Sequence, residues 1–506
     1  MSLAAVRLTL VVLVLLAVAL AVRFRERTIG KLHEFWNEPS SPLNVALLRI
    51  LLFAMLFRSA RGRGPLWYTG LPSSERDPPW GWRWLGDLPF DEGLVSGAQD
   101  ALVLSSAAAA VGLWTRATAP VAALLAVYVL GLPNFFAKVN HGGTARVLCV
   151  LALAFSPCGD ALSLDRLWKW LRGHAPPPPS SAYTIPVRVV WVLIATTYFF
   201  PGFWKLWNAG DLWITGEALR RHLYSKWADL PDFEPLFRVD QHAWLLALLG
   251  TATLAFEIGF PFALLNRATR TLAALAAAGF HVGIRYVMGI TFSPFIPLIV
   301  LIEVPERWSL LRRHVPATVL ATASALRLRL RAWQQAVRPQ REPKPWPSRS
   351  VWPALVVGMA LVVGQTVAGF AQVNSWPISV FPTFASRGIR PPERGSSLRV
   401  TLESEGEEPV DLGKRLKRLG HVRLQQALRG INTKTQKGGE AKHRSRTFVK
   451  LLRHAGVHVE PADIVVVYEA KWNVLPPGKR SGFREKVVSR YRVTRGDTLE
   501  SEPGGG

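Results

Sequence analysis

The sequence predicts an all-α polytopic membrane protein of about nine or ten transmembrane helices, followed by a small C-terminal α+β extramembrane domain. Several apolar stretches run for about 16 to 25 residues, which is enough for a helix to cross a hydrocarbon core of about 30 Å. The chain after residue 372 is polar and contains strand patterns. Spanning segments must satisfy their backbone hydrogen bonds internally, so long apolar runs indicate helices rather than a barrel.

Ten apolar stretches are candidate transmembrane helices, of which the second and the ninth are short. They divide the chain into an N-terminal helix with a basic linker (1–38), a transmembrane domain (39–310), a basic loop (311–352), a last helix (353–372) and a C-terminal domain (373–506). The candidates are 3–22, 42–57, 98–114, 117–136, 143–157, 185–205, 242–265, 268–286, 288–303 and 353–372.

The distribution of Lys and Arg predicts the orientation, because cytoplasmic loops are enriched in these residues. The densest basic segment, 304–352, is therefore expected inside. Counting spans from there places the C-terminal domain on the outer side of a multi-pass protein of the plasma or inner membrane. Arginines in the loops 58–97 and 206–241 run against this rule.

The first apolar stretch has two interpretations. Ala19 and Ala21 give the small-x-small pattern of a cleaved signal peptide. The charges favour a retained helix, since Arg7 alone precedes the stretch and a basic run from Arg23 to Lys31 follows it.

Two polar segments differ from the spans. The basic segment 304–352 combines a candidate amphipathic helix with a proline-rich linker and suits the anionic head groups of membrane lipids. Nucleic-acid binding is disfavoured, because the positive-inside bias explains the net charge of +26. The C-terminal domain contains three strand candidates, "SLRVTLES", "DIVVVYEAKWNV" and "EKVVSRYRV", two helical ones at 411–429 and 444–456, and a tail, "SEPGGG", predicted to be disordered. Cys149 and Cys158 are the only cysteines, so no disulfide framework is expected.

A lysine closes the sixth candidate span, in "YFFPGFWKLWNAGDLW". Lys205 is either an anchor in an aromatic belt at the membrane surface or a catalytic base. An apolar wall would disfavour its charged form and make a neutral amine available near neutral pH. Asn140, His141 and His281 are expected in the same leaflet, so these groups could share a site with Lys205 for a weakly acidic, lipid-soluble hydroquinone.

Each neighbouring residue also has a structural interpretation. His141 fits a cap or a solvated turn, and His281 fits a hydrogen bond between helices. Glu257 is expected towards the inner half of its span, as a structural partner of another helix rather than part of the outer site. Ser163 is expected to cap a surface helix beginning at Leu164. "GEALRRHLYSKW" predicts an interfacial helix that could roof the Lys205 site.

The order of four motifs resembles the HTTM (horizontally transferred transmembrane) domain of the vitamin K-dependent γ-carboxylase family. They are "SPLNVALLRILLFAMLF" at 41, "KVNHGGTARVLCVLALAFSPCGDALSLDRL" at 138, "YFFPGFWKL" at 198 and "GFHVGIRYVMGITFSPFIPLIVLIEVPERW" at 279. The resemblance implies that Lys205 deprotonates a reduced vitamin K or menaquinone-type hydroquinone, with O2 and CO2 as co-substrates and no metal. It further implies catalytic roles for His141 and His281, a quinone site that includes Asn140, Phe203 and Trp204, and a peptide or protein substrate on the outer side.

The chain departs from the carboxylases in ways that weaken the expectation of a protein substrate more than the expectation of a lipid-quinone site facing the outer leaflet. It has about 135 residues after the last span, where the carboxylases have a much larger region, and it keeps only the second lysine of a paired motif, with Trp204 before Lys205. The alternative is a non-catalytic membrane scaffold, or a peptide-export or toxin-associated protein, on the same fold.

Overall fold

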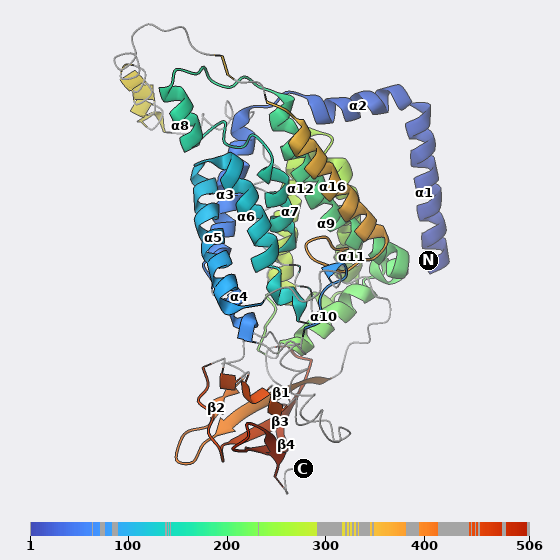
Figure 1. Cartoon of the computed structure of the whole chain (residues 1–506). Coiled ribbons are helices and arrows are strands. Elements are labelled where there is room, and N and C mark those ends of the chain that lie inside the picture. Colours follow the sequence, from blue (N-terminus) through green and yellow to red (C-terminus); the bar gives the residue numbers. More distant parts are fainter. Residues whose placement is uncertain are drawn as a thin grey trace.

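The computed structural model shows a helical bundle with a small β-sheet at one end (Figure 1). The residues described are 2–62, 64–70, 76–82, 90–136, 139, 141, 143–230, 232–290, 349–380, 394–412, 445–446, 448–450, 452–453, 456–477 and 482–502, with isolated positions between 316 and 346.

The described helices follow the predicted order. They are α1 (Leu3–Arg23), α2 (Arg25–Asn37), α3 (Pro42–Ala60), α4 (Gly64–Trp67), α5 (Glu92–Val111), α6 (Thr115–Val129), α7 (Thr144–Ala154), α8 (Leu164–Leu171), α9 (Ser181–Ile214), α10 (Glu217–Asp229), α11 (Ala243–Ala263), α12 (Arg267–Met288) and α16 (Trp352–Phe370), with 3-10 turns η1 (Tyr68–Gly70), η4 (Leu132–Phe135) and η5 (Val239–Gln241).

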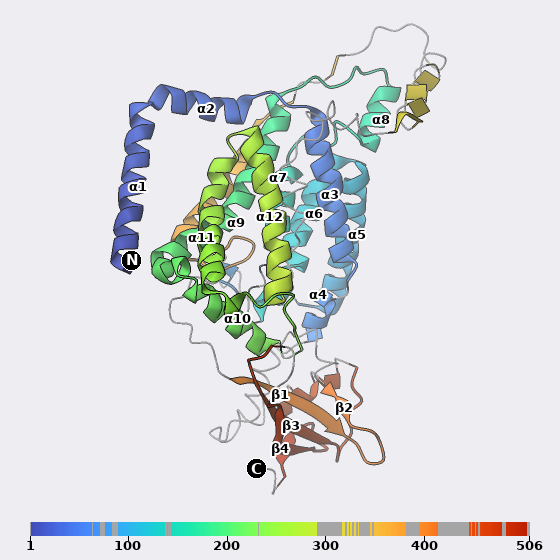
Figure 2. The ribbon, with the colours of Figure 1, turned by 180° about the vertical axis from the view of Figure 1, so that it is seen from behind.

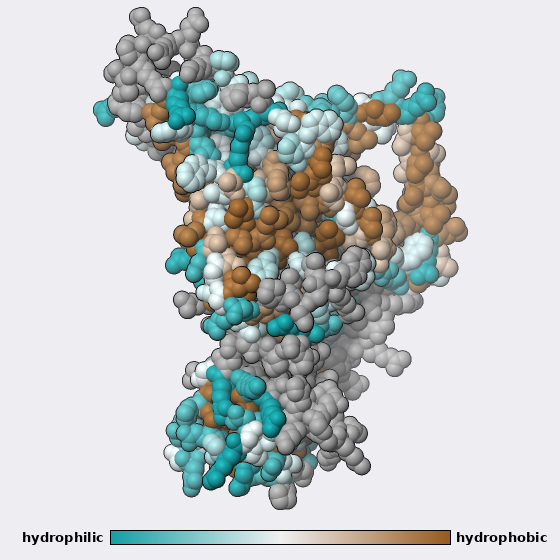
Figure 3. Space-filling view, viewed as in Figure 1, coloured by the Kyte–Doolittle hydropathy of each residue, from teal (hydrophilic) through white to brown (hydrophobic). Residues whose placement is uncertain are grey.

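Within the described residues, eight helices are long and apolar enough to cross a membrane. They correspond to eight of the ten predicted spans, with α6 and η4 together forming one of them. The stretch predicted at 143–157 is the shorter helix α7, and the one predicted at 288–303 lies almost wholly outside the described residues. A band of apolar side chains crosses the middle of the space-filling view, between hydrophilic ends (Figure 3). The predicted fold class, a polytopic helical membrane protein, is confirmed.

Helix α9 is the central element of the bundle. It packs against α11, α16, α7 and α1. Ser180 caps its start by accepting a hydrogen bond from the backbone N–H of Ala182. The helix runs for 34 residues and is kinked at Ala209, which has a φ of −150°. Lys205 therefore lies inside the helix, not at its end as predicted.

Glycines allow close approach of α9 to its neighbours. A Cβ at Gly202 would lie 2.6 Å from the Cβ of Glu257 on α11, and a Cβ at Gly369 on α16 would overlap the ring of Phe200 on α9. Small residues at such crossings let helix backbones pack tightly in a membrane.

Helix α1 stands apart from the bundle and is joined to it by α2, which lies across the end of the molecule (Figures 1 and 2). Its N-terminal part nevertheless contacts α9, since Arg7 Nε donates to the backbone oxygen of Trp207 at 2.8 Å. Most of its apolar side chains are exposed, as expected for a helix surrounded by lipid.

The C-terminal domain contains an antiparallel sheet in the order β2-β1-β3-β4-β5. The strands are β1 (Arg394–Glu403), β2 (Val410–Asp411), β3 (Ile464–Asn473), β4 (Arg484–Val493) and β5 (Leu499–Ser501). All three predicted strands are confirmed as β1, β3 and β4. Val400 pairs with Val467, and both pack in a core with Phe448 from a short helical segment. The helix predicted at 411–429 is wrong at its start, because Asp411 lies in β2, and 413–429 lie outside the described residues. The tail predicted to be disordered begins with Ser501, which ends β5, and 503–506 lie outside the described residues.

Polar elements gather at the two ends of the bundle. Helices α2 and α8 lie at one end, and α10 and the sheet lie at the other (Figures 1 and 2). This separation agrees with the predicted topology, in which the loops containing α2 and α8 are inside; the outer placement of the sheet stays a prediction.

Candidate functional site

Lys205 is buried and paired with a carboxylate. Its Nζ donates to both side-chain oxygens of Glu257, at 2.5 and 2.7 Å, and the exposed fractions of the two side chains are 3% and 5%. The prediction that Glu257 is a partner of another helix is therefore confirmed, but its expected separation from the Lys205 site is wrong. Counting residues from each span end placed the two groups at different depths, because it ended α9 at Lys205.

The pair lies in a seam between α9 and α11. Gly202, one turn before Lys205, brings the two helix backbones together at Glu257. The ring of Trp213 on α9 lies 5.1 Å from Lys205 Nζ, so an aromatic face lies beside the ammonium. Taking one charge into this apolar seam would be costly, and the second charge offsets that cost.

A second polar pair lies in the same seam. The hydroxyl of Tyr198 and Nε2 of His281 on α12 are 2.8 Å apart. Tyr198 precedes Lys205 by seven residues, so the two side chains share a face of α9 about 10 Å apart along its axis. The rings of Phe256 and Phe260, which flank Glu257 on α11, pack on Tyr198 with centroids 5.2 and 4.5 Å away. His281 therefore contacts Tyr198, about 10 Å along α9 from the Lys205–Glu257 pair. That His281 shares a site with Lys205 stays a prediction.

The other predicted site residues take different places. His141 is half-buried just before α7, which packs against α9, α6, α16 and α3. Asn140 lies outside the described residues. That His141 shares a site with Lys205 stays a prediction.

The aromatic residues predicted to hold a quinone face α16 instead of α11. Trp204 Nε1 donates to the backbone oxygen of Gly369 at 2.9 Å, and the ring of Phe203 packs edge-on against Phe370 at 5.9 Å. Since each residue turns a helix by about 100°, Phe203 points almost opposite to Lys205 on α9.

Helix α10 covers the aromatic side of the Lys205 pair. His222 is buried and stacks on Trp213, with ring centroids 5.7 Å apart and planes at 29°. This contact fits the roof predicted for this helix. Sequence reasoning missed His222 and Tyr198; the spacing of Tyr198 from Lys205 on one helical face was the available signal.

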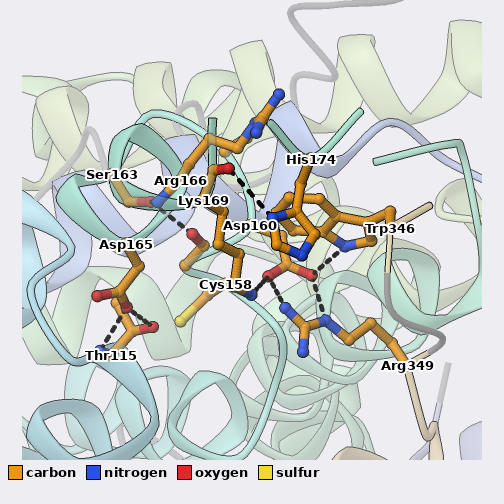
Figure 4. Close-up of polar contacts among 12 residues, drawn as sticks. Thr115, Cys158, Asp160, Ser163, Asp165, Arg166, Lys169, His174, Trp346 and Arg349 are labelled. Carbon is orange, nitrogen blue, oxygen red and sulfur yellow. Dashed lines mark hydrogen bonds and ion pairs between the residues drawn. The ribbon is translucent and has the colours of Figure 1, made fainter. Parts of the chain in front are cut away.

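A separate polar cluster surrounds the start of α8, at the end of the bundle away from α10 (Figures 1 and 4). Ser163 accepts a hydrogen bond from the backbone N–H of Arg166 at 2.8 Å, so the predicted cap of α8 is confirmed. Asp165 accepts hydrogen bonds from the backbone and side chain of Thr115 and thereby fixes α8 to the start of α6.

The comparison with family models agrees with this architecture. Residues 89–308 match the model described as the HTTM domain, a range that includes the Lys205, Glu257, Tyr198 and His281 seam. No curated protein and no solved structure matches the chain. The chain is therefore a multi-pass membrane protein that carries an HTTM domain.

Proposed function

We propose that this HTTM-domain protein is a γ-carboxylase-like enzyme in which Lys205 and Glu257 together form the base for a reduced quinone. The observation that carries the proposal is the buried Lys205–Glu257 pair, enclosed by aromatic and apolar side chains. A bound hydroquinone would supply a weakly acidic hydroxyl to this site for oxygenation, and the family resemblance extends the reaction to carboxylation of a glutamate.

The pair can exchange its proton without leaving an isolated charge. When the proton moves from Lys205 Nζ to Glu257, the products are a neutral amine and a carboxylic acid. The neutral amine can accept a proton from the hydroxyl of a bound substrate, and the resulting ammonium then balances the substrate anion. Glu257 thus sets the charge state of Lys205, and Tyr198 with His281 forms a second hydrogen-bonded pair that can hold a proton in the same seam.

A second candidate function is supported by the same geometry. Lys205 donates to both oxygens of Glu257, and both side chains are nearly inaccessible to solvent. A closed pair of this kind also suits a helix contact in a non-catalytic scaffold, whose outer domain would bind a peptide or protein partner.

Oxygen-dependent epoxidation of reduced vitamin K and menaquinone by the purified full chain tests the proposal. The key variant is Lys205→Met/Glu257→Met, because it removes both charges and leaves no unpaired group. Lys226→Met is the matched control, since Lys226 forms an exposed pair with Asp229 on α10. We expect epoxide from the wild type and the control and none from the double variant.

Two results would contradict the proposal. Epoxide from a folded Lys205→Met/Glu257→Met protein would show that the pair is not the base. Folded wild type without epoxide from either quinone would favour the scaffold.

A further inference from the structure

A buried carboxylate organises the polar cluster at the α8 end of the bundle. Asp160 accepts hydrogen bonds from Arg349 Nε at 2.6 Å, from the Tyr183 hydroxyl at 3.0 Å and from Trp346 Nε1 at 3.3 Å. Arg349 also binds the second carboxylate oxygen through Nη2. Trp346 and Arg349 belong to the basic loop, so Asp160 ties the end of that loop to the bundle (Figure 4).

Cations surround the indole of Trp346. Lys169 Nζ and the guanidinium carbon of Arg166 lie 4.5 and 5.0 Å from its ring centroid, and that of Arg349 lies 5.5 Å away. His174 contacts the same ring edge-on at 6.3 Å. Asp160 is shared between Arg349 and Lys169, whose Nζ lies 3.8 Å from it, so the cations around the indole outnumber this carboxylate.

The crowding of positive charge acts on Lys169. Burial lowers the pKa of Lys169, and repulsion from Arg349 and Arg116 lowers it further, against the attraction of Asp160 and Asp165. Within the described part of the chain, the Nη1 atom of Arg166 is buried and has no hydrogen-bond acceptor. An added anion near α8 would relieve the repulsion.

The other face of α8 is apolar and exposed. Leu164, Leu167 and Trp168 share one side of the helix and are 46%, 48% and 57% exposed. The guanidinium of Arg172 lies over the Trp168 ring at 4.6 Å. An amphipathic helix with Trp, Leu and flanking cations is suited to the boundary between head groups and acyl chains.

We propose that α8, with Trp346 and Arg349 of the basic loop, forms a binding site for the head group of an anionic phospholipid. Arg166 and Lys169 contact the phosphate, and Leu164, Leu167 and Trp168 contact the acyl chains. The apolar face argues for a lipid rather than a soluble anion, and the cations argue for an anionic head group rather than a zwitterionic one.

Titration of the detergent-purified full chain with phosphatidylglycerol, followed by thermal unfolding, tests this site. The variant is Arg166→Gln/Lys169→Gln. The control is Arg220→Gln/Arg221→Gln, which removes two cations from α10 at the other end of the bundle. Each cation near an anionic surface contributes about 1 kcal/mol, so we expect the variant to need about 30-fold more phosphatidylglycerol for the same stabilisation.

Phosphatidylcholine and inorganic phosphate complete the experiment. We expect neither to stabilise the wild type, and we expect the control variant to respond to phosphatidylglycerol like the wild type. An unchanged titration of the double variant would overturn the proposal, as would equal stabilisation by phosphatidylcholine, while equal stabilisation by phosphate would indicate a soluble-anion site. If the double variant does not fold, Arg172→Gln, which leaves Asp160 and Trp346 untouched, should weaken the titration about fivefold.

Discussion

Glu257 and Asp160 are both buried carboxylates, but they are stabilised in different ways. Glu257 has one cationic partner, Lys205, inside the helical bundle. Asp160, at the end of the bundle, has donors from α9 and from the basic loop, with Lys169 of α8 3.8 Å away. In the apolar interior an excess of either charge is costly, so a neutral pair is favoured. Near the membrane surface, water and head groups can balance the extra cations around Asp160.

The strongest test of this comparison is Glu257→Ala. The substitution leaves the Lys205 ammonium buried without its carboxylate, and breaking a buried pair in this way costs about 3–5 kcal/mol. The measurement is the unfolding free energy in detergent. Lys205→Met/Glu257→Met should retain most of the stability, because no charge stays buried. If both variants lose the same unfolding free energy, the unpaired charge is not the main cause, and other contacts of the two side chains account for the loss.

Asp160→Asn should have a smaller effect. The amide keeps the shape of the side chain but weakens the hydrogen bonds from Arg349, and such bonds to charged groups contribute about 1.5–3 kcal/mol. Thermal unfolding of the variant measures the loss. Asp229→Asn, in an exposed pair with Lys226, is the control and should cost less than about 1 kcal/mol. If Asp160→Asn lowers the stability no more than this control does, the hydrogen bonds of Asp160 do not hold the basic loop against the bundle.

Gly202→Ala tests how closely the seam must pack. The new methyl group would lie 2.6 Å from the Cβ of Glu257, so the helices must separate, and overpacking of this kind costs about 1–3 kcal/mol. Gly259→Ala on α11 is the matched control, because its Cβ would meet no atom within 4 Å. Equal stability of the two variants would contradict a tight seam.

The smallest expected effect concerns a third carboxylate, Asp240, on the α10 side. Burial alone would raise the pKa of Asp240, but hydrogen bonds from Arg238 and Tyr224 outweigh it and lower the pKa. Because the folded pKa is below the unfolded value of about 3.9, this stabilisation is complete above that pH and is lost as the pH falls through the folded pKa. Thermal unfolding between pH 6 and 3 should show this loss. The loss should be smaller in Asp240→Asn, and an identical pH profile for that variant would exclude the pair as its source.

The sequence was informative where a pattern repeats along the chain. Apolar length predicted eight of the described helices, and alternation predicted β1, β3 and β4. Ser163 was identifiable as a cap because its partner is three residues away.

Contacts between distant segments could not be predicted in this way. Arg349 pairs with Asp160 across 189 positions, and neither residue belongs to a periodic pattern. Lys205 and Glu257 were placed at different depths because a continuous helix past Lys205, kinked at Ala209, has no sharp marker in the sequence. The contacts inside a bundle depend on which helix faces meet. The sequence of a single span does not contain that information.

The glycine contacts of α9 have an evolutionary consequence. Gly202 lies on α9 itself, whereas Gly369 lies on α16 and makes room for Phe200. A larger residue at either position would meet the facing helix and would need a compensating change there, so we expect single substitutions at these positions to be rare. In related sequences these two crossings should therefore vary as linked pairs, more slowly than the lipid-facing surface of α1.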